Sequence, residues 1–224
     1  MDNQSIAIIT AVVMISLAVF AVIYFVVKHY LKVRANREIG KKGEKRVSQV
    51  LASIARSKHY KVINNLYLPL YDSTTEIDHI VIGPFGAVVI ESKAYNGEIY
   101  GTQKEKEWTQ MIGDKKNKFY NPLLQNKTHI DCIHHILIKN NVYRVDLESL
   151  VVFSGDKCEV NVPHNLPVIS LSELKKYFNK SKFKQDKKID VQKVYDTLMA
   201  NQVTDKKLLS QHNHDVKKMA KNHQ

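Results

Sequence analysis

Asp78, Glu91 and Lys93 interrupt two runs of strand-forming apolar residues in the stretch EIDHIVIGPFGAVVIESK. Burying an unpaired charge inside a sheet costs free energy, so the presence of charged residues at these positions requires an explanation. The tetrapeptide GPFG between the runs contains residues that are typical of turns and predicts a four-residue hairpin loop. If Ile82 faces Ala87 across that loop, antiparallel pairing sets Asp78 against Glu91 and places Lys93 on the same face.

Two carboxylates directly across a ladder repel each other unless a positive charge lies between them. We therefore predict that Asp78 and Glu91 hold Mg²⁺ or Mn²⁺, because oxygen ligands with room for water and a phosphate suit these ions. Ser92 is expected on the opposite face. The chemistry would be phosphodiester hydrolysis, with Lys93 orienting the nucleophile or stabilising the developing anion. The alternative is a strand end where both acids reach solvent and Lys93 forms a surface ion pair.

A helix before the hairpin supplies a further acid. The stretch GKKGEKRVSQVLASIA has apolar residues at helical spacing and predicts an amphipathic helix that packs on the protein's own core. Glu44 lies on the apolar face of this helix. Alternatively, Glu44 is an acid in the first turn of the helix that interacts favourably with the helix dipole.

Strand and helix patterns alternate along the rest of the chain and predict an α/β fold, a mixed sheet flanked by helices. Four closely spaced strands predict an antiparallel meander. Asn121 and Pro122 begin a helix as N-cap and first helical residue, and Ser172 caps a later helix that ends at Phe178. The expected strands are residues 60–68, 77–82, 87–93, 97–102, 150–153 and 167–169.

The N-terminal segment predicts a membrane anchor. Ile6 to Val27 runs 22 residues without a charge, enough to cross roughly 30 Å of hydrocarbon. A cleaved signal peptide is the competing interpretation, but residues 1–5 carry no base and no A-x-A site follows. Lys and Arg crowd residues 28–46 and are absent before the span. The positive-inside rule then places residues 1–5 outside and everything after the span in the cytoplasm.

Composition indicates the class of binding partner and the division of the chain into domains. The net charge of +12 points to a polyanion, either nucleic acid or an anionic membrane surface. Cys132 and Cys158 have no disulfide or zinc spacing. We predict a basic juxtamembrane linker over residues 28–37, a globular domain over residues 38–179, and a lysine-rich, partly helical tail over residues 180–224.

Several motifs in order resemble the nuclease-related domain family, NERD, of the PD-(D/E)xK superfamily of restriction-endonuclease-like nucleases. The resemblance covers about Gly40 to Ile138, and Ile77 replaces the proline of the superfamily's name. The motifs are Gly40-x-x-Gly43-Glu44, Glu76-Ile77-Asp78-His79, Gly86, Glu91-x-Lys93, Gly97 to Gly101 with Trp108 beyond, and Asn121-Pro122-x-x-Gln125.

The resemblance implies a role for five residues. Asp78 and Glu91 would be metal ligands, Lys93 the catalytic lysine, Glu44 an accessory acid and Gln125 an active-site residue at a helix start. Without the resemblance, Gln125 would be interpreted as a polar residue in the first turn of a capped helix. His129, one turn further along that helix, is expected on its surface.

Two functions remain open from the sequence. One is a membrane-anchored, cytoplasmic, Mg²⁺-dependent nuclease that acts on DNA through sequence-independent phosphate contacts. The other is a module that keeps the nuclease fold without turnover and binds nucleic acid or a protein partner. The complete set of two acids and a lysine favours the nuclease, because paired carboxylates repel phosphate when no metal is present.

Overall fold

The computed structural model describes residues 3–71, 73–205 and 208, and divides into two compact units, residues 1–41 and 42–224. Helix α1 (Asn3–Lys58) contributes to both units. In the first unit, the apolar side chains described from Val12 to Val27 are exposed. By length and composition, this helix could cross a membrane, a test that a signal sequence also passes. The predicted span from Ile6 to Val27 lies within it.

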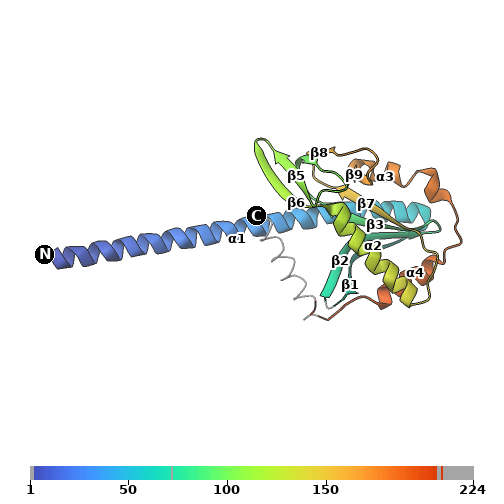
Figure 1. Ribbon diagram of the computed structural model, residues 1–224, viewed down its shortest axis with the longest axis horizontal. Helices are drawn as coiled ribbons and strands as arrows, with labels where there is room; N and C mark the ends of the chain where they lie inside the picture. Colours follow the sequence, from blue (N-terminus) through green and yellow to red (C-terminus); the bar gives the residue numbers. More distant parts are fainter. Residues whose placement is uncertain (1–2, 72, 206–207, 209–224) are drawn as a thin grey trace. The chain divides into compact units, whose positions relative to one another are not determined.

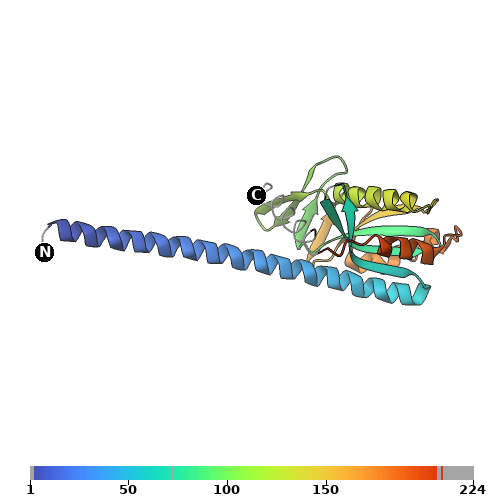
Figure 2. The same cartoon turned by 90° about the horizontal axis from the view of Figure 1, so that it is seen from below.

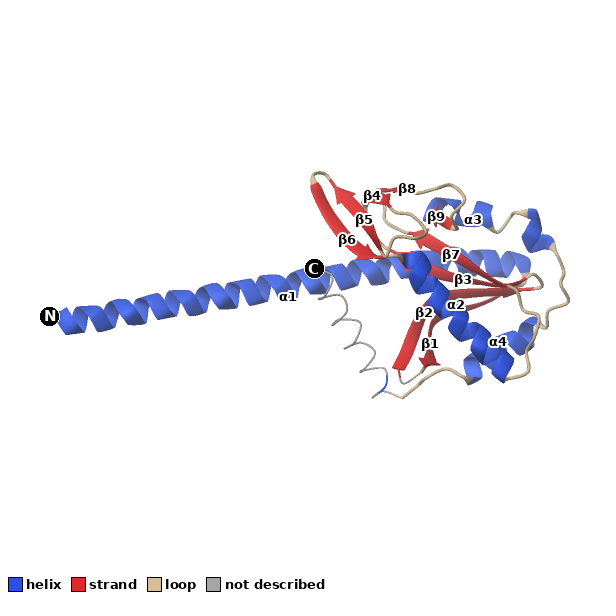
Figure 3. Ribbon diagram, in the orientation of Figure 1, coloured by secondary structure: helices blue, strands red, loops and turns tan. Residues whose placement is uncertain are grey.

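The second unit is built on a mixed five-stranded sheet (Figures 1 and 3). β1 pairs with β2 and β2 with β3 in antiparallel fashion, whereas β3 pairs with β7 and β7 with β9 in parallel. This confirms the predicted α/β fold with a mixed sheet flanked by helices. The strands, in sheet order, are β1 (Lys61–Leu70), β2 (Ser73–Gly83), β3 (Gly86–Lys93), β7 (Leu147–Phe153) and β9 (Val168–Ser170).

Helices cover both faces of this sheet, as Figure 2 shows edge-on. One face packs on α2 (Pro122–Lys139) and α4 (Val191–Ala200). The other face packs on the last part of α1, through Val47, Leu51 and Ile54, and on α3 (Leu174–Tyr177). The helical spacing read from GKKGEKRVSQVLASIA therefore identified a core-facing helix correctly. Burying apolar side chains on both faces holds the strands as a rigid layer.

The chain also forms a second, four-stranded sheet, in the order β6-β5-β4-β8. The predicted meander is thus correct for β1 to β3 and wrong for the fourth strand, because β4 pairs with β5 and β8 instead of extending the first sheet. β5 and β6 were not predicted. The bounds are β4 (Gly97–Tyr100), β5 (Glu107–Ile112), β6 (Lys115–Tyr120) and β8 (Cys158–Asn161).

The hairpin register predicted across GPFG is confirmed for Ile82 opposite Ala87. The loop itself is shorter than expected, because Gly83 and Gly86 also pair and leave Pro84 and Phe85 as the turn. Gly86 has a φ of 119°, and a Cβ there would lie 2.3 Å from the carbonyl oxygen of Asp146. The glycine lets the turn approach the chain just before β7.

Capping explains where the helices begin. The Asn121 side chain accepts a hydrogen bond from the Leu123 amide, and Pro122 is the first residue of α2, as predicted. The cap predicted at Ser172 is wrong. Ser170 is the capping residue, with Glu173 in a capping box, and a short 3-10 helix, η1 (Leu171–Glu173), precedes α3.

The chain after residue 179 is partly helical, as predicted, but up to residue 200 it packs on the domain. It contains the 3-10 helix η2 (Ser181–Lys184) and α4. Phe183, Val194 and Leu198 are buried in the two core clusters. Most of the tail predicted beyond residue 205 lies outside the described residues.

Candidate active site

Asp78 lies where β2 and β3 stop pairing with each other. The ladder ends at His79 and Ile90, and the Asp78 carboxylate takes over as acceptor: Oδ2 receives hydrogen bonds from the Ser92 amide at 2.8 Å and from the Ser92 hydroxyl at 3.1 Å. The expectation that Ser92 points away from Asp78 is therefore wrong. The neighbouring strand β1 is also irregular, because Asn65 has a φ of 52°.

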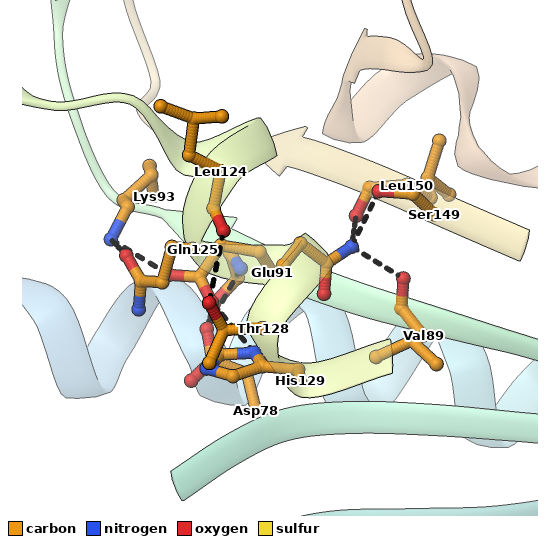
Figure 4. A network of polar contacts seen from close by, with 12 residues as sticks. Asp78, Val89, Glu91, Lys93, Leu124, Gln125, Thr128, His129, Ser149 and Leu150 are labelled. Carbon is orange, nitrogen blue, oxygen red and sulfur yellow. Dashed lines mark hydrogen bonds and ion pairs between the residues drawn. The ribbon is translucent and has the colours of Figure 1, made fainter. Parts of the chain in front are cut away.

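Glu91, Lys93 and Gln125 form a chain of direct contacts from β3 to the first turns of α2. Lys93 Nζ lies 2.7 Å from Glu91 Oε1 and donates a hydrogen bond of 3.0 Å to Gln125 Oε1. Glu91 is buried, whereas the Lys93 side chain is 20% exposed. Figure 4 shows these side chains and Asp78 gathered at one end of the sheet. Gln125 therefore contacts the catalytic candidate Lys93 directly.

Burial, together with the charge of neighbouring acids, shifts the pKa values of both Asp78 and Glu91 upward. Burial raises the pKa of Asp78 to about 8, and the neighbouring Glu91 carboxylate adds to the rise against the lowering effects of Lys93 and Ser92. Burial also raises the pKa of Glu91, with Lys93 acting in the opposite direction. Burial alone would lower the pKa of Lys93, but the charges of Glu91, Tyr95 and Asp78 and the hydrogen bond to Glu91 together outweigh it, so the pKa is raised and the ammonium stays charged.

A divalent cation fits this donor set. Glu91 Oε2 is buried and accepts no hydrogen bond in the part of the chain that the structure describes, which leaves a hard oxygen atom available beside a second carboxylate. The described residues contain no group of three or more His, Cys, Asp or Glu side chains arranged to hold a metal. Mg²⁺ does not require one, because it commonly binds through one or two carboxylates and keeps several waters.

Glu44 approaches the same acids from α1. Its charge contributes to the raised pKa of Glu91, as does that of Glu76. Both side chains are half-buried. The structure therefore joins Asp78 to Glu91 by charge, Glu91 to Lys93 and Lys93 to Gln125 by direct contact, and Glu44 to Glu91 by charge. Glu76 was quoted in a motif but not predicted as a site residue.

Gly43 lets α1 come close enough to present Glu44. A Cβ on Gly43 would lie 2.5 Å from Ala94 Cβ and 2.5 Å from Ser154 Oγ, whereas a Cβ on Gly40 would have no neighbour within 4 Å. Only the second glycine of the Gly-x-x-Gly-Glu motif is therefore required by packing against the strand ends.

Gly43→Ala is expected to destabilise the protein by about 1 to 3 kcal/mol, because helix α1 must move away from Ala94 and Ser154. The matched control Gly40→Ala should be neutral or stabilising by up to about 1 kcal/mol, since alanine is the better helix former. Thermal unfolding measures both changes. Equal effects of the two substitutions would contradict the proposed close approach.

His129 was expected on the helix surface, and that prediction is wrong. His129 is buried, and its Nδ1 lies 3.5 Å from Glu91 Oε2. Gln125 and His129 are four residues apart on α2 and so share the face that covers the site. The spacing was a usable signal, but the sequence alone did not show that this face turns toward Glu91.

His129→Ala is expected to weaken Mg²⁺ binding by roughly 10- to 100-fold, the usual effect of removing a group that orients a metal-ligating carboxylate. The measurement is the Mg²⁺ concentration that gives half of the rise in melting temperature. His134→Ala is the control, because His134 is exposed on the same helix. Equal Mg²⁺ midpoints for the two variants would rule out this role for His129.

The remaining motif residues attach the second sheet to the site. Asn121 Nδ2 donates to the carbonyl oxygens of Thr102, Gln103 and Glu105. A Cβ on Gly101 would lie 2.3 Å from the Trp108 ring, which is fully buried. These residues fix the loop before β5 against the start of α2, the helix that carries Gln125.

A mixed sheet flanked by helices, with Asp78, Glu91 and Lys93 at one end beside the start of α2, defines an α/β protein with a nuclease-like arrangement of charged residues. More specifically, the chain belongs to the NERD (nuclease-related domain) family, whose match covers residues 39–154. This range contains all five predicted site residues.

A relative in Bacillus anthracis supports the assignment. This uncharacterized protein is 34% identical to the chain over 177 residues, which are 77% of this chain and 81% of that protein. The comparison with solved structures found no match. The resemblance read from the ordered motifs is thus confirmed, and the nuclease-related character of the chain rests on the family.

Proposed function

We propose that the protein is a membrane-anchored, cytoplasmic, metal-dependent nuclease that hydrolyses phosphodiester bonds in nucleic acid, with DNA as its substrate. The observation that carries this proposal is the convergence of Asp78, Glu91, Lys93 and Gln125 at one end of the sheet. A protein that only bound nucleic acid would have no use for two neighbouring acids, one buried and one half-buried, that repel phosphate.

Asp78 and Glu91 would hold Mg²⁺ or Mn²⁺, which when bound supplies positive charge beside a scissile phosphate. Ser92 orients the Asp78 carboxylate through two hydrogen bonds to one oxygen and leaves Oδ1 available. Lys93 is held between Glu91 and Gln125. Because its pKa is raised, Lys93 acts as a fixed cation and hydrogen-bond donor to the phosphate or the attacking water, and not as a general base.

The membrane part of the proposal is supported by the apolar helix in the first unit. The basic residues that follow the apolar stretch support a cytoplasmic location for its C-terminal side and for the nuclease-like domain. Exposed lysines and arginines near that end of the span would also contact anionic lipid headgroups.

The test is cleavage by the full chain in detergent, with linear, nicked and single-stranded DNA and with RNA as substrates. We expect DNA cleavage with Mg²⁺ or Mn²⁺ and none with a chelator. A chain that binds DNA but cleaves none of these substrates with either metal would support the non-catalytic binding module instead.

A further inference from the structure

A lysine-rich surface lies at the end of the main sheet opposite the candidate active site. The segment from residue 175 to residue 188 contains seven lysines and a single acid, Asp186. In Figure 1 the segment is drawn in orange at the right-hand end of the sheet, where β2 turns into β3, whereas α2 begins at the other end. We call this segment the distal lysine surface.

The segment is fixed to the domain by its aromatic residues. Tyr177, Phe178 and Phe183 are buried in the core cluster beneath α1. Phe183 packs edge-on against Phe85, with the ring centroids 4.9 Å apart, and its carbonyl accepts a hydrogen bond from the Tyr60 hydroxyl. The backbone that carries the lysines beside these aromatic residues is therefore anchored to the domain, unlike that of a solvated tail.

The acids around this surface are already engaged. Glu148 pairs with Lys182 and Asp146 with Lys187. Asp186 accepts a hydrogen bond from the Lys188 amide, and Glu173 caps the helix that begins after Ser170. Five exposed lysines make no ion pair with any described residue, namely Lys175, Lys176, Lys180, Lys184 and Lys188.

Carrying several like charges on one short, anchored segment raises the energy of the folded protein, and a bound polyanion would lower that energy. We propose that the distal lysine surface is a second nucleic-acid-binding site, which contacts the phosphate backbone away from the point of cleavage. The choice of nucleic acid as the polyanion rests on the proposed function. A lipid surface is less well matched, because the aromatic residues of the segment are buried and leave no apolar group to insert among lipid tails.

The two sites are separated by about the length of β3. The Lys187 amide donates to the Pro84 carbonyl at one end of that strand, and Lys93 is its last residue at the other. Seven residue steps at about 3.3 Å correspond to roughly 23 Å, less than one turn of a DNA duplex. One nucleic acid molecule can therefore contact both sites.

The test compares two variants of the full chain in detergent that lose the same charge. The first replaces Lys175, Lys176, Lys180 and Lys184 by Gln, and the control replaces Lys127, Lys139, Lys157 and Lys193, which are exposed elsewhere. Lys188 is left unchanged because its φ is 56°. Binding of a DNA duplex of about 30 base pairs is measured with EDTA over a range of salt concentrations.

We expect the first variant to bind the duplex at least about tenfold more weakly at roughly 0.1 M salt. At that salt concentration, each lost phosphate contact lowers the affinity by up to about eightfold. The salt dependence of its binding should also be shallower. The control should bind like the parent. Equal binding by the two variants, with unchanged melting temperatures, would overturn the proposal. Because EDTA prevents cleavage, this result does not depend on whether the chain is a nuclease.

Lysine acetylation followed by mass spectrometry identifies what covers the surface. In nanodiscs of neutral lipid, the duplex should protect Lys175, Lys176, Lys180 and Lys184 from acetylation. Protection by anionic lipid but not by DNA would show a membrane-contacting surface and would overturn the proposal.

Discussion

Lys93→Met is expected to lower kcat for DNA cleavage by about 10² to 10³-fold, the usual effect of removing one charged or hydrogen-bonding group that stabilises the transition state. Lys93 is the cation of the site, held 2.7 Å from Glu91 Oε1. Methionine keeps the length of the side chain and removes the charge. Lys139→Met, an exposed lysine at the end of α2, is the control and should cleave like the parent.

The loss of Lys93 also leaves Glu91 buried without its partner, which reduces stability. Gln125→Ala separates the two effects, because it keeps the Lys93 and Glu91 pair and removes only the acceptor that orients Lys93. We expect a loss in kcat of about tenfold with an unchanged melting temperature. Folded Lys93→Met protein that cleaves at the parental rate would exclude a catalytic role for this lysine.

The arrangement of the site was predictable where local rules decide it. Partner numbers have a fixed sum in a hairpin, so the turn at GPFG was enough to predict the pairs Ile82 with Ala87 and Ile80 with Val89. The predicted pair of Asp78 with Glu91 lies beyond the ladder, which ends at His79 and Ile90, and Asp78 instead accepts hydrogen bonds from Ser92. The loop length was wrong because Gly86 adopts a positive φ and pairs with Gly83, which shortens the turn. That change leaves the register of the pairs unaltered.

The failures come from contacts between distant segments. β4 leaves the main sheet because β7, which arrives some fifty residues later, occupies the free edge of β3. His129 is buried because α2 packs on that part of the sheet, which spacing within the helix does not show. The missed hairpin of β5 and β6 had a signal, since Gly113 and Asp114 are typical two-residue turn residues, but the lysines of β6 obscured the strand pattern.

The second large effect concerns stability without metal. The folded-state pKa of Asp78 is about 8, well above its usual value of 3.8. The folded protein therefore retains a proton that the unfolded chain loses, and stability should fall as pH rises between those two values. Asp78→Asn removes this titration while keeping an oxygen that can accept from Ser92. With EDTA at about pH 8, we expect Asp78→Asn to raise the melting temperature by about 2 to 4 °C for each kcal/mol gained.

We expect Mg²⁺ to reverse the order of stability of the parent and Asp78→Asn. Mg²⁺ at about a hundred times its Kd stabilises a protein that binds it only when folded by about 2.7 kcal/mol, so the parent should gain and Asp78→Asn should not. Asp131→Asn is the control, because Asp131 is exposed on α2 and its pairing with Lys127 is a surface contact. If Asp78→Asn were less stable than the parent with EDTA at pH 8, the charge of the Asp78 carboxylate would not be what destabilises the metal-free protein. If Mg²⁺ stabilised both equally, Asp78 would not be its ligand. Together the two measurements separate a carboxylate that is destabilising until metal arrives from one that serves only the fold.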